Sequence, residues 1–157
     1  MGQEIEKKFL VKDGINIDEL GQAVRITQGY LSSVKERTVR VRIKGDGGFL
    51  TIKGIGNDSG ASRYEFEQSI TTKDANDLLK ICEPGVIDKT RTNVVIERHT
   101  FEVDRFFGEN QGLIVAEVEL TSENEDFTKP SWLGAEVTGD PKYYNSMLMK
   151  NPYSSWK

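Results

Sequence analysis

Charged side chains alternate with apolar ones in short runs along most of this chain. In the first run, Glu4, Glu6 and Lys8 occupy every second position. Residues two apart in a β-strand point to the same face, so this face carries two carboxylates and an ammonium group. The same spacing recurs at further pairs: Arg40 and Arg42, Thr51 and Lys53, Glu65 and Glu67, Lys89 and Arg91, Glu102 and Asp104, and Glu117 and Glu119. A chain with this pattern is expected to form a sheet with one strongly ionic face.

The ionic face of such a sheet can point to solvent or to an interior. For any single strand, a half-buried sheet with its polar face in water is the ordinary interpretation. Here the charges are sorted strand by strand into acidic and basic groups, although like charges opposite each other destabilise a sheet. A site for a metal cation and an anion needs that sorting, because carboxylates bind the cation and Lys or Arg binds the anion. We therefore interpret the pattern as a charged interior.

The strand signals are short alternating runs bounded by turn residues. They predict strands at residues 4–12, 24–32, 38–44, 49–53, 63–69, 88–94, 100–106 and 113–120. Helices are expected after an N-cap at Thr72, from Ser122 with Glu125 at capping-box spacing, and at residues 145–150. The predicted fold class is α+β, mostly β: an eight-stranded antiparallel closed barrel or tunnel, with a charged interior and a few helices packed outside.

Composition limits the classes of function. The length of 157 residues predicts one domain, 1–157. A net charge of −4 argues against a protein that binds a nucleic acid duplex through its phosphates. No stretch approaches the roughly 18 apolar residues of a membrane span, so no membrane partner is expected. A single cysteine, Cys82, fits a reducing compartment, and we expect a cytoplasmic location.

The ordered motifs resemble those of one known family. The run Glu4-Ile5-Glu6-Lys7-Lys8 is similar to the ExExK signature of the CYTH superfamily, the triphosphate tunnel metalloenzymes. The resemblance covers nearly the whole chain and continues through Gln28-Gly29-Tyr30-Leu31, Arg40-Val41-Arg42, Leu50-Thr51-Ile52-Lys53, Arg63-Tyr64-Glu65-Phe66-Glu67, Asp88-Lys89-Thr90-Arg91, Phe101-Glu102-Val103-Asp104, Ala116-Glu117-Val118-Glu119 and Glu136-Val137-Thr138-Gly139-Asp140, followed by Tyr143 and Asn145. ExExK alone is a weak pattern, but these blocks in this order are specific.

The resemblance implies a role for each matching residue. It implies metal ligands, or carboxylates that complete the metal environment, at Glu4, Glu6, Glu65, Glu67, Asp104, Glu117 and Glu119. It implies a phosphate clamp formed by Lys8, Arg40, Arg42, Lys53, Lys89 and Arg91. Residues expected to assist the chemistry are Lys8, Lys53 and Tyr30. The implied cofactor is Mg²⁺ or Mn²⁺, because both accept oxygen ligands.

The expected activity is hydrolysis of inorganic triphosphate to pyrophosphate and phosphate, with nucleoside triphosphates as further candidate substrates. Three alternatives remain open from the sequence: a class IV adenylate cyclase, a thiamine triphosphatase and a non-catalytic polyphosphate-binding module. An exposed apolar barrel wall would favour a homodimer.

Overall fold

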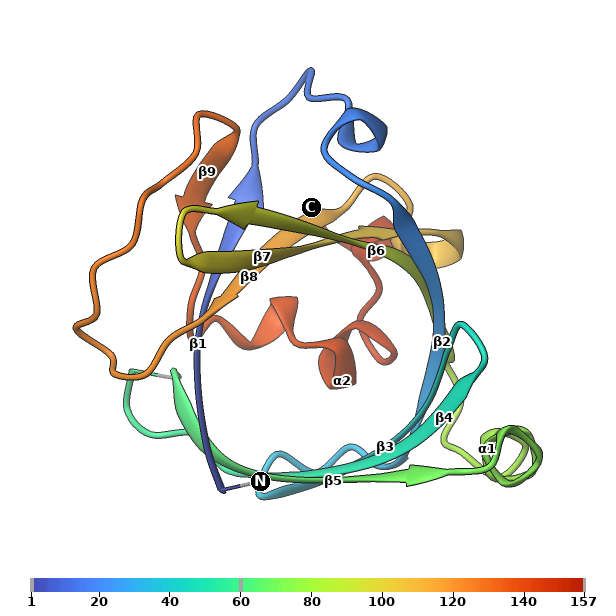
Figure 1. Cartoon of the computed structure of the whole chain (residues 1–157). Helices are drawn as coiled ribbons and strands as arrows, with labels where there is room; N and C mark the ends of the chain where they lie inside the picture. Colours follow the sequence, from blue (N-terminus) through green and yellow to red (C-terminus); the bar gives the residue numbers. More distant parts are fainter. Residues whose placement is uncertain (1, 60, 157) are drawn as a thin grey trace.

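The structure, a computed structural model, describes residues 2–59 and 61–156. Within these residues, nine strands form one antiparallel sheet: β1 (Gly2–Val11), β2 (Ala23–Ser32), β3 (Arg37–Lys44), β4 (Gly47–Gly54), β5 (Ser62–Ile70), β6 (Ile87–Ile96), β7 (His99–Phe106), β8 (Ile114–Glu119) and β9 (Leu133–Glu136). The strand order is β5-β4-β3-β2-β6-β7-β8-β1-β9, and a further pairing of β5 with β1 closes the barrel (Figure 1). The predicted eight-stranded closed barrel is therefore confirmed.

Strand β9 is an addition that the alternating pattern does not predict. It is four residues long and pairs only with the C-terminal end of β1, opposite Phe9 and Val11. Gly134 of β9 lies so close to β1 that an added Cβ would be 3.0 Å from the carbonyl oxygen of Leu10. A short strand that contains glycine has too few side chains to show a period of two.

A hydrophobic core lies outside the barrel wall, on the apolar face of β1, β6, β7 and β8. Phe9, Phe101, Val118 and Trp132 are central members of this cluster. Residues 121–136 and the 3-10 helix η1 (Ile17–Glu19) run over this face. The barrel is therefore inside out compared with an ordinary small barrel, because its apolar packing is external.

The helix expected from Ser122 is not formed. Residues 121–124 make bends and a turn, and the Glu125 carboxylate accepts hydrogen bonds of 2.6 Å from both the backbone N–H and the hydroxyl of Thr121. His99 Nε2 lies 2.7 Å from the other Glu125 oxygen. The spacing that suggested a capping box therefore fastens a loop to the barrel.

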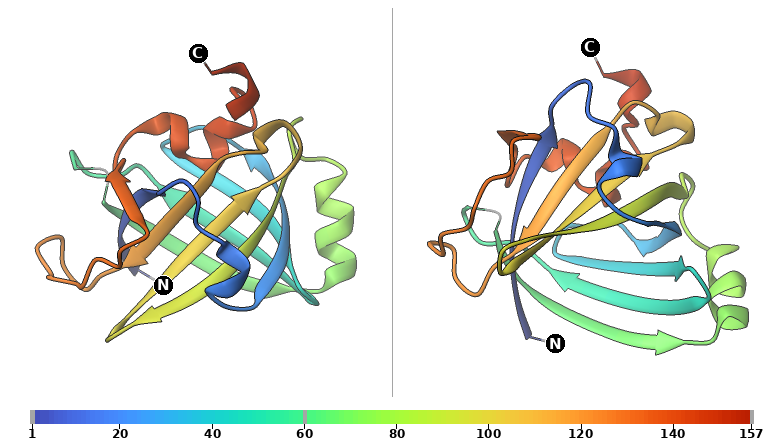
Figure 2. Two further views of the ribbon diagram at one scale, coloured as in Figure 1. Left: turned by 90° about the horizontal axis from the view of Figure 1, so that it is seen from above. Right: turned by 45° about the horizontal axis from the view of Figure 1, so that its top comes forward.

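Helix α1 (Thr72–Leu79) packs on the outside of the barrel, as expected. Its N-cap is Thr71, one residue before the predicted cap, and the Thr71 hydroxyl accepts a 3.0 Å bond from the N–H of Asp74. A Cβ added at Gly48 of β4 would lie 3.0 Å from Ala75, so glycine allows the helix to approach the sheet. Figure 2 shows α1 against one side of the barrel.

The C-terminal elements depart from the expectation that helices pack outside. Helix α2 (Asn145–Leu148) follows η3 (Pro141–Tyr143) and lies across the interior in the view along the barrel (Figure 1). Tyr143 and Leu148 form a second cluster with Ile87, Phe106 and Val115, which share the inward face of their strands with the ionic residues. One end of the interior is therefore filled with apolar side chains. The chain continues through η4 (Tyr153–Ser155), and η2 (Gly108–Asn110) follows β7.

No helix within the described ranges is long and apolar enough to cross a bilayer.

Candidate active site

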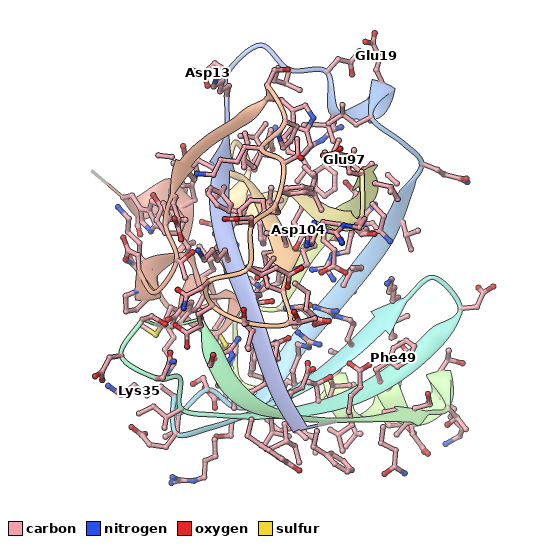
Figure 3. The ribbon with its side chains drawn as sticks, turned by 60° about the vertical axis from the view of Figure 1, so that its left-hand side comes forward. Asp13, Glu19, Lys35, Phe49, Glu97 and Asp104 are labelled. Carbon is pink, nitrogen blue, oxygen red and sulfur yellow. The ribbon has the colours of Figure 1, made fainter. Side chains whose placement is uncertain are left out.

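An ionic cavity of about 220 Å³ occupies the interior of the barrel. It is lined by twelve of the side chains that the sequence singles out: Glu4, Glu6, Lys8, Tyr30, Arg40, Arg42, Lys53, Glu65, Glu67, Arg91, Glu117 and Glu119. The charged interior predicted from the alternating pattern is therefore confirmed. Figure 3 shows another of the predicted residues, Asp104, within the barrel, whereas Asp13, Glu19 and Lys35 lie at the periphery.

The cavity has an acidic half and a basic half. Four neighbouring strands, β7, β8, β1 and β5, supply its carboxylates: Glu102, Glu117, Glu119, Glu4, Glu6, Glu65 and Glu67. The strands β4, β3 and β6 supply cations: Lys53, Arg40, Arg42, Lys44 and Arg91. Lys8 and Arg63 are the two cations that line the acidic half, on β1 and β5. The acidic and basic residues, which the sequence assigns to different strands, therefore lie on different sides of the cavity.

Carboxylates oppose each other directly in the acidic half. Glu6 is the register partner of Glu119, and Glu102 is the register partner of Glu117. Burial, reinforced by the charges of Glu117 and Glu4, raises the pKa of Glu6 to about 8. Burial and Glu4 also raise the pKa of Glu119. Like charges directly opposite are destabilising, so this wall favours a proton or another cation between its carboxylates.

Glu117 behaves differently from Glu6 because cations face it. Burial alone would raise its pKa, but Lys8 and Arg91 outweigh burial and hold the pKa well below the usual range. The Lys8 ammonium lies 3.5 Å from the Glu117 carboxylate. The neighbouring pair Glu6 and Glu117 therefore shares one proton at neutral pH.

The donor chemistry of the acidic half suits a hard divalent cation, because its carboxylate oxygens are the ligands that Mg²⁺ and Mn²⁺ accept. Glu4 Oε1 is buried and accepts no hydrogen bond from the described residues. Within residues 2–59 and 61–156, no three Asp, Glu, His or Cys side chains are grouped closely enough to coordinate a metal ion as they stand. The carboxylates instead pair with cations: Lys53 Nζ lies 3.0 Å and Arg63 Nε 3.5 Å from Glu4 Oε1.

The basic half presents two guanidinium groups from one strand. An Arg40 terminal nitrogen donates a 3.1 Å bond to Thr51 and lies 3.8 Å from Glu67. Arg42 Nε donates a 2.9 Å bond to Gln28. Burial, with repulsion from Arg40 and Arg91, lowers the pKa of Arg42 to about 9. An anion in the cavity would relieve this repulsion.

Lys89 and Asp104 do not line the cavity but lie directly beneath it. Lys89 is fully buried, and its ammonium is 2.7 Å from Asp104. Arg91 donates two bonds, of 2.7 and 2.8 Å, to the same carboxylate. Burial opposes ionisation of Asp104, but Arg91 and Lys89 outweigh it and lower its pKa to about 2. Asp104 is thus tied to two cations, and its expected part in the metal environment stays a prediction.

The C-terminal segment Tyr143–Ser146 forms one boundary of the cavity and is held by three interior cations. Lys8 Nζ donates a 3.3 Å bond to the carbonyl of Tyr143 and lies 5.4 Å from the centre of the Tyr144 ring. Arg63 lies 5.7 Å from the same ring centre. Lys89 Nζ donates a 3.1 Å bond to Asn145 Oδ1.

Several lining residues are absent from the predicted set. Arg63 and Lys44 continue the alternation of Glu65 and Arg42, so the same spacing could have identified both. Tyr144, Asn145 and Ser146 also line the cavity but come from a turn and a short helix. Such a segment has no strand period, and only the closed fold brings it to the site. Tyr30 and Lys53 both line the cavity, as predicted, from β2 and β4.

Comparison with known proteins agrees with this geometry. The family model described as the CYTH domain matches residues 2–146. The chain is 49% identical to a protein of Acetivibrio thermocellus named inorganic triphosphatase, over 100% of this chain and 99% of the relative. It is 38% identical to an inorganic triphosphatase of Nitrosomonas europaea, over 92% of this chain and 95% of the relative. The crystal structure of the inorganic triphosphatase NE1496 superposes with a TM-score of 0.65 at 33% identity, covering 95% of each chain. The chain belongs to the CYTH domain family.

Proposed function

We propose that this protein is a divalent-metal-dependent triphosphatase that hydrolyses inorganic triphosphate to pyrophosphate and phosphate. The observation that carries the proposal is the cavity inside the barrel, with carboxylates on one half and Lys and Arg on the other. The names of the relatives from Acetivibrio thermocellus and Nitrosomonas europaea point to the same activity.

The charges of the cavity favour a small and highly charged ligand. The carboxylates of the cavity pair with its cations, and a ligand that carries charge of both signs can replace these pairs without leaving buried charges unpartnered. A triphosphate with a divalent cation is such a ligand. A cavity of about 220 Å³ is also below the roughly 300–1,000 Å³ of pockets for drug-sized ligands. This size favours inorganic triphosphate over a nucleoside triphosphate or thiamine triphosphate as the substrate.

The basic half would hold the phosphate chain. Arg40 and Arg42 can each offer two parallel N–H groups to phosphate oxygens, and Lys53 adds a point charge. Lys8 and Arg91 would reach the chain from either side of the carboxylates. Lys89 does not line the cavity and would act indirectly, by holding Asp104, which in turn holds Arg91. These cations would stabilise the charge that develops on the leaving pyrophosphate.

The acidic half would hold the cofactor, Mg²⁺ or Mn²⁺. We assign Glu4, Glu6 and Glu119 as its ligands, with Glu65, Glu67 and Glu117 completing its surroundings. When bound, the ion would shield the phosphate charges and polarise the reacting phosphoryl group. In the reaction, a water oxygen bonds to the terminal phosphorus while the bond from this phosphorus to the bridging oxygen breaks. A cavity carboxylate would accept the proton of that water, and Lys53 or Tyr30 would donate one to the leaving group.

A panel of substrates with purified protein tests the proposal. Tripolyphosphate, ATP, thiamine triphosphate and pyrophosphate would each be incubated with Mg²⁺, Mn²⁺ or a chelator, and orthophosphate and cyclic AMP would be measured. We expect metal-dependent release of phosphate and pyrophosphate in equal amounts from tripolyphosphate. Cyclic AMP from ATP as the main product would favour the cyclase instead, and tight binding without turnover would favour a binding module.

The cytoplasmic location and the homodimer stay predictions from the sequence. Val95, near the end of β6, and Ile81, just after α1, are each about 70% exposed, but they lie at separate places on the barrel. Size-exclusion chromatography with light scattering would determine the oligomeric state.

A further inference from the structure

We propose that Gln28 is a positioning residue for Arg42, and that it is an amide because a carboxylate there would cancel the charge with which Arg42 binds phosphate. This inference deepens the proposed function and rests on it.

Gln28 and Arg42 are a cross-strand pair in the middle of the barrel wall. They are register partners in the pairing of β2 with β3. Arg42 Nε donates a 2.9 Å hydrogen bond to Gln28 Oε1, and the two residues are 8% and 0% exposed. This bond uses the nitrogen nearest the stem of the arginine. The two terminal nitrogens are left for a ligand in the cavity, which Arg42 lines.

Arg42 differs from the other buried cations in its partners. Lys8, Lys89 and Arg91 each lie within 4.0 Å of a carboxylate. Among the residues that the structure describes, Arg42 has no carboxylate within that distance. Arg91 is the closest comparison, because Asp104 holds its Nε and one terminal nitrogen in the way that Gln28 holds Nε of Arg42. Asp104 therefore positions the Arg91 guanidinium and neutralises its charge, whereas Gln28 positions the Arg42 guanidinium and leaves its charge uncompensated.

In this arrangement the Gln28 amide keeps one hydrogen-bond donor unsatisfied within the described part of the chain. Gln28 Nε2 is buried and has no hydrogen-bond partner among the described residues. Glutamate would have the same shape, and both of its oxygens could accept from the Arg42 guanidinium, as both Asp104 oxygens accept from Arg91. A buried donor without a partner destabilises a protein, so glutamine is not the choice that stability alone favours. The choice is explained if the uncompensated charge of Arg42 is needed for an anion.

Three variants separate positioning from a structural role. Gln28→Glu keeps the acceptor but neutralises Arg42, and Gln28→Leu removes the acceptor. Gln68→Glu adds the same charge at an exposed position of β5 and serves as the control. Thermal unfolding would be measured in chelator, tripolyphosphate binding by calorimetry in chelator, and kcat and KM with saturating Mg²⁺.

We expect Gln28→Glu and Gln28→Leu to change stability in opposite directions and binding in the same direction. Gln28→Glu should raise Tm by about 2–4 °C or more, and Gln28→Leu should lower it by a similar amount. Both should weaken tripolyphosphate binding and raise KM by about tenfold or more, with a much smaller change in kcat. The control should match the wild type in both measurements.

Two results would overturn the inference: wild-type affinity and KM in Gln28→Glu, or wild-type affinity in a folded Gln28→Leu. Failure of the proposed function looks different. In that case the wild type would bind tripolyphosphate without hydrolysing it, and the loss of binding in the Gln28 variants would still be measured. A wild type that neither binds nor hydrolyses tripolyphosphate would contradict both.

Discussion

At the scale of single residues, the carboxylates that face each other are the most demanding feature of this protein. Glu6 lies opposite Glu119 and close to Glu117, and burial with these neighbours raises the pKa of Glu6 to about 8. The sequence alone identifies these three glutamates and predicts that they point to the same face of the sheet. Their direct opposition depends on the register of β1 with β8, which the sequence pattern does not specify.

The raised pKa of Glu6 predicts how stability depends on pH without metal. The folded protein binds this proton up to about pH 8, whereas the unfolded chain releases it near 4.5. Glu6 therefore favours folding at low pH, and its contribution is lost progressively as pH rises from about 4.5 to about 8. Gln at this position carries no such charge. In chelator at pH 8 and above, Glu6→Gln should unfold at least about 2–4 °C higher than wild type, and the difference should shrink toward pH 5. An equal difference at both pH values would show that Glu6 does not titrate in this range.

Replacement of a proposed metal ligand should abolish activity and leave the fold intact. Glu119→Ala removes one oxygen donor and relieves repulsion with Glu6, so we expect background turnover with a Tm at or above that of the wild type in chelator. Glu36→Ala, in the exposed turn before β3, is the matched control and should be fully active. Near-normal turnover of Glu119→Ala at saturating metal would remove Glu119 from the ligand set.

At the scale of elements, period-two alternation predicts strands well and predicts the rest poorly. All eight barrel strands follow from alternation: seven carry charged side chains on one face, and β2 carries Gln28 and Tyr30 there. Strand β9 and the Thr121–Glu125 turn do not, because short irregular segments are shaped by their contacts with the barrel. The position of α2 in the interior also could not be predicted, because the segment owes it to contacts from Lys8, Arg63 and Lys89 on three separate strands.

The pairing of β6 with β7 depends on the buried group formed by Lys89, Arg91 and Asp104. Asp104→Asn would leave the buried Arg91 guanidinium without its main carboxylate partner, and we expect a loss of about 3–5 kcal/mol in the free energy of unfolding at pH 7. Lys89 contributes less to this loss, because burial already lowers its pKa to about 7 and it can release its proton. The pKa of Asp104 is lowered to about 2, so its contribution is present above about pH 4 and is lost as pH falls toward 2. Urea unfolding of both proteins should therefore show a difference in the free energy of unfolding that narrows as pH falls below about 4. A difference below about 1 kcal/mol at pH 7 would contradict this assignment.

At the scale of the whole molecule, closure of the sheet creates the site. The acidic strands β7, β8, β1 and β5 and the basic strands β4, β3 and β6 face each other only because β5 pairs with β1. The segment Tyr143–Ser146 then bounds the cavity near its apolar end. The sequence predicts the charges and the barrel, whereas the volume of the cavity and its C-terminal boundary depend on the folded chain.

The small size of the cavity predicts selectivity for inorganic tripolyphosphate over nucleoside triphosphates. We expect kcat/KM for tripolyphosphate to exceed that for ATP by at least about tenfold, because a cavity of about 220 Å³ leaves little room for a nucleoside. Tyr144→Ala should reduce this ratio by removing a lining side chain. An unchanged ratio would show that this boundary does not select the substrate.

The central claim is that the interior charges bind metal and triphosphate together. Crystals grown with Mn²⁺ and tripolyphosphate, measured at the manganese absorption edge, test it most directly. We expect an anomalous peak inside the barrel, in contact with carboxylate oxygens of Glu4, Glu6 or Glu119, and phosphate density against Arg40 and Arg42. Manganese bound only on the outer surface, with no phosphate inside the barrel, would contradict this claim.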